Sequence, residues 1–373
     1  MGTHVRAIKV RDVVEGIKEY KPGRWIEGAI KLSSNENPLG PSQKAVEAVI
    51  RCARLISRYP ETLSSLDGCG CEAELIQELA GRLGVPPEGI VLGAGVDGVL
   101  DTLVKLFVEN GDEVVIPIPT FSLYETLVRL MGGIPRFLQR DEQRNFEVAA
   151  TDVIEVTVQK TKLVFLSSPN NPTGDVVAEA ELRAILEALP SAAVVVDEAY
   201  VEFAERSFVP LVREYENLII TRTFSKAFGL AGLRVGYAVM DENLAREYKK
   251  VAIPFSVNAL GIAAALAALR DEEHLKRTVS LVKAERAFLL ENIPFKTFPS
   301  HANFVLVDVS PFTSKQAFEF LVERGIVVRD CSSFRGAGTS LIRISVGTHE
   351  QNLKVIDALE SLYTRRRHAQ DEY

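Results

Sequence analysis

The sequence is poor in cysteine, in excess positive charge and in long apolar runs. Its four cysteines among 373 residues, Cys52, Cys69, Cys71 and Cys331, show neither a zinc-ligand spacing nor the density of a disulfide-rich secreted domain. We therefore expect no metal site and a reducing, cytoplasmic setting, in which Cys69-Gly70-Cys71 forms an ordinary loop.

Acidic residues outnumber basic ones by 50 to 43, which gives a net charge of -7 at pH 7. An acidic chain has no general electrostatic attraction for nucleic acid or for an anionic membrane, so we expect neither as a partner. The longest apolar run, residues 259–269, is far shorter than the roughly 20 residues that span a bilayer and is interpreted as a buried helix. Residues 1–16 carry charges throughout and lack the apolar stretch of a secretory signal.

Apolar runs rich in valine and isoleucine alternate with helical patterns through the middle of the chain. Continuous apolarity is typical of strands that are buried on both faces of a parallel sheet. We therefore predict an α/β fold with a mostly parallel sheet wrapped by helices. The predicted strands lie within residues 89–93, 112–119, 161–169, 192–200, 217–226 and 234–240, and the helices between them include 122–133 and 180–190.

The pattern changes after residue 255 to longer helices over 260–292, followed by a β-α-β-β series that indicates a smaller α/β domain. The first forty residues show no clear strand and are expected to form an arm packed on another surface. The last ten residues are predicted to be a frayed tail. The predicted organisation is an arm over 1–45 that packs on the small domain or a partner subunit, a large domain over 46–255 and a small domain over 256–373.

Polar side chains follow the predicted strands where these end. Asp197 and Tyr200 follow one strand, Asn170 and Asn171 another, and Lys226 a third. Because ligands of open α/β sheets bind beyond the carboxyl ends of the strands, these groups should converge on one crevice. Pyridoxal phosphate requires this set: a lysine for a Schiff base, a carboxylate facing its pyridine nitrogen, and donors for its phosphate.

Three segments carry a family resemblance: SPNNPTG (168–174), VVDEAY (195–200) and TFSKAFGLAGLRVGY (223–237). In this order they resemble the signature segments of the fold-type I pyridoxal-phosphate aminotransferases. The resemblance implies that Lys226 binds the cofactor covalently and moves protons, and that Asp197 pairs with the pyridine nitrogen. It further implies the following contacts: Asn171 and Tyr200 to the phenolic oxygen, Phe121 to the ring face, and Val96, Asp97, Thr223, Ser225 and Arg234 to the phosphate.

Tyr59 is similar to the family tyrosine that reaches the cofactor phosphate of a neighbouring subunit, so the resemblance also implies a homodimer. The stretch GAGVDG (93–98) fits the dinucleotide fingerprint of NAD-dependent oxidoreductases. In such a site an acidic residue ends the second strand, whereas Asp112 and Glu113 precede it here. We interpret the glycine-rich turn instead as the start of a phosphate-binding helix, and the oxidoreductase is the weaker alternative.

Four further segments are most similar to those of histidinol-phosphate aminotransferases: KLSSNENPLGPS (31–42), PSHANFVLV (299–307), VVRDCSSF (327–334) and IRISVGTHEQN (342–352). The resemblance implies that Arg343 binds the α-carboxylate of glutamate or 2-oxoglutarate, and that Arg329 and Tyr20 bind a substrate phosphate. It predicts ping-pong transfer of an amino group from L-glutamate to imidazole-acetol phosphate, a step of histidine biosynthesis. A threonine-phosphate decarboxylase of cobalamin biosynthesis and a broad or aromatic aminotransferase stay open as alternatives, because these residues do not fix how the substrate lies over the ring.

Overall fold

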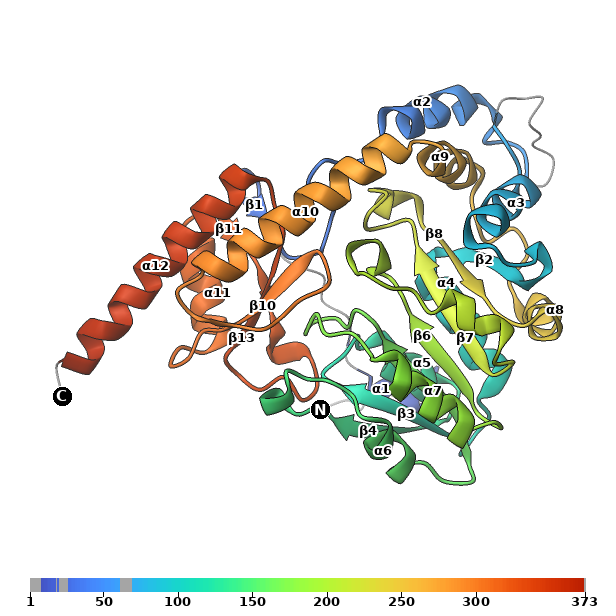
Figure 1. Ribbon diagram of the computed structural model, residues 1–373, viewed down its shortest axis with the longest axis horizontal. Helices are drawn as coiled ribbons and strands as arrows, with labels where there is room; N and C mark the ends of the chain where they lie inside the picture. The colour runs from blue at the N-terminus through green and yellow to red at the C-terminus, as the bar shows by residue number, and fades with distance from the viewer. Residues whose placement is uncertain (1–7, 18, 20–25, 61–68, 372–373) are drawn as a thin grey trace.

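The computed structural model describes residues 8–17, 19, 26–60 and 69–371 (Figure 1). A large sheet carries helices on both faces, and a smaller sheet lies beside it against α10, α11 and α12. The helices are α1 Asp12–Glu15, α2 Gln43–Cys52, α3 Glu72–Leu83, α4 Gly95–Phe107, α5 Leu123–Leu130, α6 Ala150–Glu155, α7 Glu179–Ala188, α8 Glu242–Val251, α9 Ala259–Leu269, α10 Glu272–Asn292, α11 Ser314–Val322 and α12 His349–Asp371.

The large sheet has seven strands in the order β2-β8-β7-β6-β5-β3-β4. Strand β8 is antiparallel to both of its neighbours, and the other pairings are parallel. The strands are β2 Ile90–Ala94, β3 Glu113–Ile118, β4 Ile134–Gln139, β5 Thr161–Ser167, β6 Ala193–Asp197, β7 Leu218–Thr223 and β8 Val235–Val239.

Both faces of this sheet are buried, which explains the continuous apolar runs. On β5, Val164 and Leu166 join the core beneath α3, α6, α7 and α9, whereas Leu163 and Phe165 join the core beneath α4, α5 and α8. Because successive side chains of a strand point to opposite faces, both sets must be apolar. The apolar run at 259–269 forms α9, which is buried as predicted.

The smaller sheet has the order β12-β13-β10-β9 and is antiparallel throughout. Its strands are β9 Lys296–Thr297, β10 Phe304–Asp308, β12 Arg329–Asp330 and β13 Leu341–Ser345. A separate two-stranded ladder joins the N-terminal arm, through β1 Ile30–Lys31, to β11 Ile326–Val327 of the C-terminal part. The arm is therefore attached by backbone pairing to the chain segment that leads into β12.

Two elements differ from the sequence prediction because their apolar signal is weak or short. Strand β4 was not predicted, since it lies at the sheet edge and its side chains alternate between exposed and partly exposed. The arm was expected to have no strand, but β1 pairs two residues with β11. The domain boundaries at residues 45 and 255 stay predictions.

Two further expectations are wrong. The last ten residues were expected to be a frayed tail, but α12 continues to Asp371, because no proline or glycine interrupts residues 349–371. The cysteines were expected to be reduced, but Cys52 at the end of α2 forms a disulfide with Cys69. Both sulfurs are buried against α9, so the Cys69-Gly70-Cys71 segment is anchored covalently to α2.

Within the described ranges, none of the helices combines the length and the apolarity that crossing a membrane requires.

Candidate active site

The carboxyl ends of β2, β5, β6 and β7 lie at the same end of the large sheet, and most predicted site residues lie just beyond them. Strand β6 ends at Asp197, and β7 ends at Thr223, three residues before Lys226. Strand β5 ends at Ser167, ahead of the turn that holds Asn171, and β2 leads directly into α4. The structure thus brings together side chains that are far apart in the sequence.

Asp197 is a buried carboxylate held by neutral donors. Its Oδ2 accepts a hydrogen bond from the Tyr124 hydroxyl at 2.6 Å, and its Oδ1 accepts from the Thr221 hydroxyl and the Ala199 N–H, both at 3.2 Å. Burial raises the pKa of Asp197 to about 6, because desolvation disfavours the charged form and the donors offset only part of this effect. A cation beside this carboxylate, such as a protonated pyridine nitrogen, would restore its charge.

Lys226 presents an amine whose proton is weakly held. Its Nζ donates to the Ser34 carbonyl at 3.1 Å and lies 5.8 Å from the centre of the Tyr200 ring. Burial, and to a smaller extent the charge of Arg343, lowers the pKa of Lys226 to about 8. An amine with this pKa is deprotonated more readily than an ordinary lysine, as a nucleophile or base requires.

Tyr200 and Asn171 are each oriented by a neighbour. The buried Tyr200 hydroxyl accepts from Asn35 Nδ2 at 2.9 Å. Asn171 Oδ1 accepts from Arg343, which also donates to the Ser33 carbonyl at 2.6 Å. Because its oxygen faces this cation, the Asn171 amide nitrogen is turned away from Arg343 and is set as a donor.

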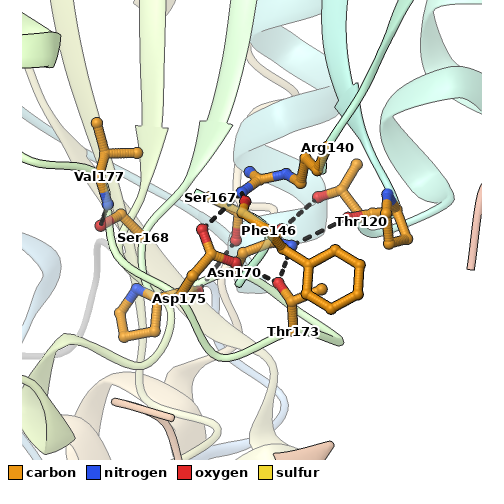
Figure 2. A network of polar contacts seen from close by, with 11 residues as sticks. Thr120, Arg140, Phe146, Ser167, Ser168, Asn170, Thr173, Asp175 and Val177 are labelled. Carbon is orange, nitrogen blue, oxygen red and sulfur yellow. Dashed lines mark hydrogen bonds and ion pairs between the residues drawn. The ribbon is translucent and has the colours of Figure 1, made fainter. Parts of the chain in front are cut away.

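Asn170, which the sequence placed among the crevice residues, instead fixes the turn that carries Asn171 (Figure 2). Its Nδ2 donates to the Pro119 carbonyl at 3.0 Å and to the Thr173 hydroxyl at 2.6 Å. Its Oδ1 accepts from the Thr120 hydroxyl at 2.7 Å. The turn after β5 is therefore joined to the segment that follows β3.

The same network continues to a buried ion pair (Figure 2). Thr173 donates to Asp175, whose other oxygen pairs with Arg140 at 2.6 Å, and Arg140 also donates to the Phe146 carbonyl at 2.9 Å. Both charged side chains are almost fully buried. A buried pair of this kind is costly to break and therefore keeps the turns after β3 and β5 in one arrangement.

The N-terminus of α4 forms the floor of an anion site. The helix begins at Gly95, so the backbone N–H groups of Val96 and Asp97 lie in its first turn, where no intrahelical acceptor is available. A Cβ on Gly95 would collide with the guanidinium of Arg234, and a Cβ on Gly236 would collide with the backbone nitrogen of Val96. The two glycines thus allow Arg234 and β8 to approach the helix end closely.

The side of this anion site comes from residues at and after the end of β7. The Thr223 hydroxyl donates to Ser225 Oγ at 2.9 Å, and Arg234 Nη1 donates to the same oxygen at 3.3 Å. Arg234 Nη2 also pairs with Asp97 at 2.8 Å. Hydroxyls, a guanidinium and helix N–H groups are the donors that a phosphate ester accepts from.

Two arginines lie opposite each other on the small sheet. Arg329 of β12 and Arg343 of β13 are register partners in an antiparallel pair, so their side chains leave the same face. Arg343 is buried, whereas Arg329 is partly exposed and donates to Ser333 Oγ at 3.3 Å. Because like charges directly opposite each other destabilise a sheet, this pair favours an anion on that face.

The remaining predicted residues lie in different surroundings. Phe121 is partly exposed, with its ring centre 5.8 Å from that of Tyr124 in an edge-on arrangement. Tyr59 is 66% exposed and packs on Phe255, with ring centres 4.6 Å apart. Tyr20 lies outside the described residues.

Sequence reasoning missed two sets of candidate residues. Tyr124, the donor to Asp197, stacks on Phe165 with ring centres 4.6 Å apart, and burial raises the pKa of its phenol, so it stays a neutral donor. The aromatic spacing in PTFSLY could have indicated it. Residues 33–35 of the arm contact Arg343, Lys226 and Tyr200, but these contacts depend on how the arm packs, which no local pattern shows.

These residues fit pyridoxal phosphate. An amine of lowered pKa, a buried carboxylate and an anion site lie at the same end of the large sheet, and Gly95 lets the guanidinium of Arg234 approach the start of α4. The dinucleotide alternative does not fit the topology. A dinucleotide-binding βαβ unit needs its first two strands side by side, whereas β8, β7, β6 and β5 separate β2 from β3.

Residues 27–359 match the family model described as aminotransferase class I and II. The chain is 48% identical to a histidinol-phosphate aminotransferase of Methanosarcina mazei, over 94% of this chain and 96% of that protein. It is 36% identical to one of Methanocaldococcus jannaschii, over 97% of this chain and 100% of that protein.

Solved structures are similar over nearly the whole chain. The histidinol-phosphate aminotransferase of Sinorhizobium meliloti in complex with pyridoxal-5'-phosphate has a TM-score of 0.83 at 27% identity, covering 96% of this chain and 98% of that chain. L-threonine-O-3-phosphate decarboxylase of Porphyromonas gingivalis has a TM-score of 0.76 at 24% identity, covering 90% and 99%. The latter likeness shows the fold alone.

Replacing Asp197 with asparagine is expected to stabilise the cofactor-free protein at pH 8. A carboxyl whose pKa is 3.8 when unfolded and about 6 when folded binds more protons in the folded state. Stability is therefore lost as the pH rises from 4 to 6, by about 3 kcal/mol in total. Asp197→Asn avoids this loss, so its Tm should exceed that of the wild type by a few degrees at pH 8 and by about half as much at pH 5.

Asp175→Asn is the matched control for this measurement, because Asp175 is equally buried but paired with Arg140. Its Tm should fall at both pH values. An Asp197→Asn protein that melts below the wild type at pH 8 would show that Asp197 is not a destabilising charge in the cofactor-free protein.

Proposed function

We propose that this chain, which belongs to the class I and II aminotransferase family, transfers the amino group of L-glutamate to imidazole-acetol phosphate. The products are 2-oxoglutarate and L-histidinol phosphate, an intermediate of histidine biosynthesis. The observation that carries the proposal is the opposed pair Arg329 and Arg343, which suits substrates bearing a phosphate or a carboxylate. The relatives named histidinol-phosphate aminotransferase support the same reaction.

Five residues act around the ring of the cofactor. Pyridoxal phosphate, when bound, supplies a conjugated ring that accepts electrons from the substrate carbon. Lys226 holds the cofactor through Nζ and, once released, takes and returns the proton at that carbon, a role that its lowered pKa supports. Asp197 keeps a proton on the ring nitrogen, Asn171 and Tyr200 hydrogen-bond the phenolic oxygen, and Phe121 packs on the ring face.

The phosphate of the cofactor is assigned to the anion site. The backbone N–H groups of Val96 and Asp97 point to it from α4, and Thr223, Ser225 and Arg234 supply hydroxyl and guanidinium donors. The side chain of Val96 is buried, so its contribution comes from the backbone. Helix N–H groups and an arginine together hold a dianion without any excess of positive charge on the whole chain.

The two arginines divide the substrate groups between them. Arg343 binds the α-carboxylate of glutamate through the planar fork of its guanidinium. Histidinol phosphate has no α-carboxylate, so we assign its phosphate to Arg329, which is less buried than Arg343 and lies directly opposite it in the small sheet. The contact of Tyr20 with that phosphate stays a prediction.

We also propose a homodimer in which Tyr59 reaches the cofactor phosphate of the partner subunit. In the described part of the chain, Tyr59, Ile56, Ile253 and Phe255 are large apolar side chains with 45% to 68% of their surface exposed. A second copy of the chain would cover this area. Exposed apolar patches of this kind commonly mark subunit contacts.

A cytoplasmic location is proposed from the cysteine content, and cell fractionation would check it. Intracellular proteins of hyperthermophiles also carry disulfides, so the Cys52–Cys69 bond is compatible with this location.

The visible absorption of the protein loaded with pyridoxal phosphate tests the reaction. L-Histidinol phosphate is expected to remove the visible band, because it gives its amino group to the cofactor. 2-Oxoglutarate is expected to restore the band, because it takes the amino group from the cofactor. L-Threonine phosphate is the comparison. Release of carbon dioxide from it with the band retained would favour a decarboxylase, and protein that acquires no band would contradict both reactions.

Arg329→Ala is expected to raise the KM for histidinol phosphate about 10- to 100-fold and to leave the KM for glutamate nearly unchanged. The range corresponds to the loss of one charge-assisted hydrogen bond, about 1.5 to 3 kcal/mol. Steady-state kinetics with each substrate measures this difference. Arg324→Ala, on the surface of the same domain, is the control, and equal rises in both KM values for Arg329→Ala would contradict the assignment.

Mixing Tyr59→Ala and Lys226→Ala subunits is expected to restore activity that each variant lacks alone. If each site uses Tyr59 from the other subunit, a hybrid dimer has one site with both Lys226 and Tyr59 and one site with neither. Random pairing makes about half of the dimers hybrids, so the mixture should show about a quarter of the wild-type activity. Assays after unfolding and refolding the mixture measure this recovery. No recovery, or a monomer by sedimentation, would refute the shared site.

A further inference from the structure

Three consecutive residues of the arm contact three of the groups assigned to the reaction. The Ser33 carbonyl accepts from Arg343 at 2.6 Å, the Ser34 carbonyl accepts from Lys226 at 3.1 Å, and Asn35 Nδ2 donates to the Tyr200 hydroxyl at 2.9 Å. The first two contacts use backbone atoms. The third uses a side chain, so residue identity matters only at Asn35.

The orientation of the Asn35 amide is determined by its neighbours. Asn35 N–H donates to Ser345 Oγ at 2.9 Å, so the Ser345 hydroxyl directs its own hydrogen to Asn35 Oδ1, at 3.0 Å. With Oδ1 facing Ser345, Nδ2 must face Tyr200. Asn303 Nδ2 also donates to the Asn35 carbonyl at 3.0 Å, so the backbone on both sides of this residue is fixed.

The backbone of Asn35 is suited to asparagine. Its φ is 56°, in the left-handed region that asparagine tolerates better than most residues. The side chain is 1% exposed, so water does not compete for its hydrogen bonds. The amide is therefore held rigidly against Tyr200 rather than sampling several partners.

We propose that Asn35 is a positioning residue that makes Tyr200 a hydrogen-bond donor toward the phenolic oxygen of the cofactor. This inference rests on the proposed function. An oxygen that accepts from Asn35 directs its own hydrogen elsewhere, and a hydroxyl that accepts one hydrogen bond becomes a stronger donor in the next. Tyr200 would thereby stabilise the ionised phenolic oxygen and keep the pKa of the bound cofactor low.

Asn35 also links Tyr200 to the strand that carries Arg343, because Ser345 lies two residues farther along β13. Lys226, in the segment after β7, has its Nζ 5.8 Å from the centre of the Tyr200 ring. The charges of Arg343 on β13 and Glu36 of the arm act on the pKa of Lys226, and Asp197 of β6 acts together with Tyr200 on the pKa of Tyr124. A test of Asn35 must therefore leave these charges in place.

Asn35→Gly meets that condition, because glycine accepts the positive φ and deletes the amide without adding charge. The readout is the pH titration of the visible absorption of the loaded protein without substrate, which does not depend on turnover. Asn35→Gly is expected to raise the pKa of this transition by about half a unit, as expected for weakening one hydrogen bond.

Tyr200→Phe completes a double-mutant cycle. If Asn35 acts through Tyr200, Asn35→Gly/Tyr200→Phe should titrate like Tyr200→Phe alone. Asn37→Gly is the matched control in the same loop, because Asn37 Nδ2 contacts the Ala227 carbonyl and the Thr278 hydroxyl instead, and it should titrate like the wild type.

A wild-type titration for Asn35→Gly, or shifts that add in full with Tyr200→Phe, would overturn the inference while leaving the proposed function intact. A wild-type protein that takes up no pyridoxal phosphate would overturn the proposed function and the inference with it. Measuring the cofactor bound per subunit first separates these outcomes from a variant that fails to fold.

Discussion

Burial of Asp197 beneath α5 is the constraint on which the site depends. The hydrogen bonds from its neutral donors, of which the one from Tyr124 is the shortest, offset only part of the cost of burying the charge of this carboxylate. Burial also disfavours the charged form of Lys226 in the same crevice, although its charge has the opposite sign. A cofactor that offers a protonated ring nitrogen to one and a carbonyl carbon to the other relieves both, so binding energy is built into the fold before any substrate arrives.

The site also requires that groups from two different sheets act on one ligand. The large sheet provides Asp197 and the segment with Lys226, whereas Arg343 belongs to the small sheet. The arm segment 33–35 lies between them, and its pairing with β11 keeps it in register with the small sheet. Arg343 also reaches Asn171 of the large sheet directly. The site is thus assembled across the sheets through polar contacts, next to an apolar cluster in which Tyr200 and Ala227 pack with Phe304 of the small sheet.

Much of this arrangement could be predicted from the sequence because buried parallel strands have a strong local signature. The runs that end at Asp197 and Thr223 were predicted as strands, and the α/β fold class, the aminotransferase class and the pyridoxal phosphate cofactor are confirmed by the family match and the similar structures. Strand β4 and the Cys52–Cys69 pair were not predicted. An edge strand lacks continuous apolarity, and a disulfide depends on the distance between two chain segments.

The contacts of Asn35 and Tyr124 could not be predicted for a related reason. Each joins residues more than 70 positions apart, so the donor and acceptor become neighbours only after the sheet and the arm have packed. The roles assigned to the individual site residues stay predictions, and their placement at one sheet edge is what the structure adds. The substrate remains a proposal that rests on Arg329 and Arg343.

The position of β8 has a consequence for the order of folding. In the seven-stranded sheet, β2 has β8 as its neighbour, although β8 begins at Val235, far along the chain from Ala94. During synthesis, β2 and the start of α4 therefore emerge long before the strand that completes their side of the sheet. Such long-range pairing is slow and leaves an unpaired edge exposed in the meantime. The phosphate-binding end of the site should consequently be among the last parts of the large sheet to mature, and the nascent chain would gain affinity for the cofactor only after Arg234 and β8 leave the ribosome.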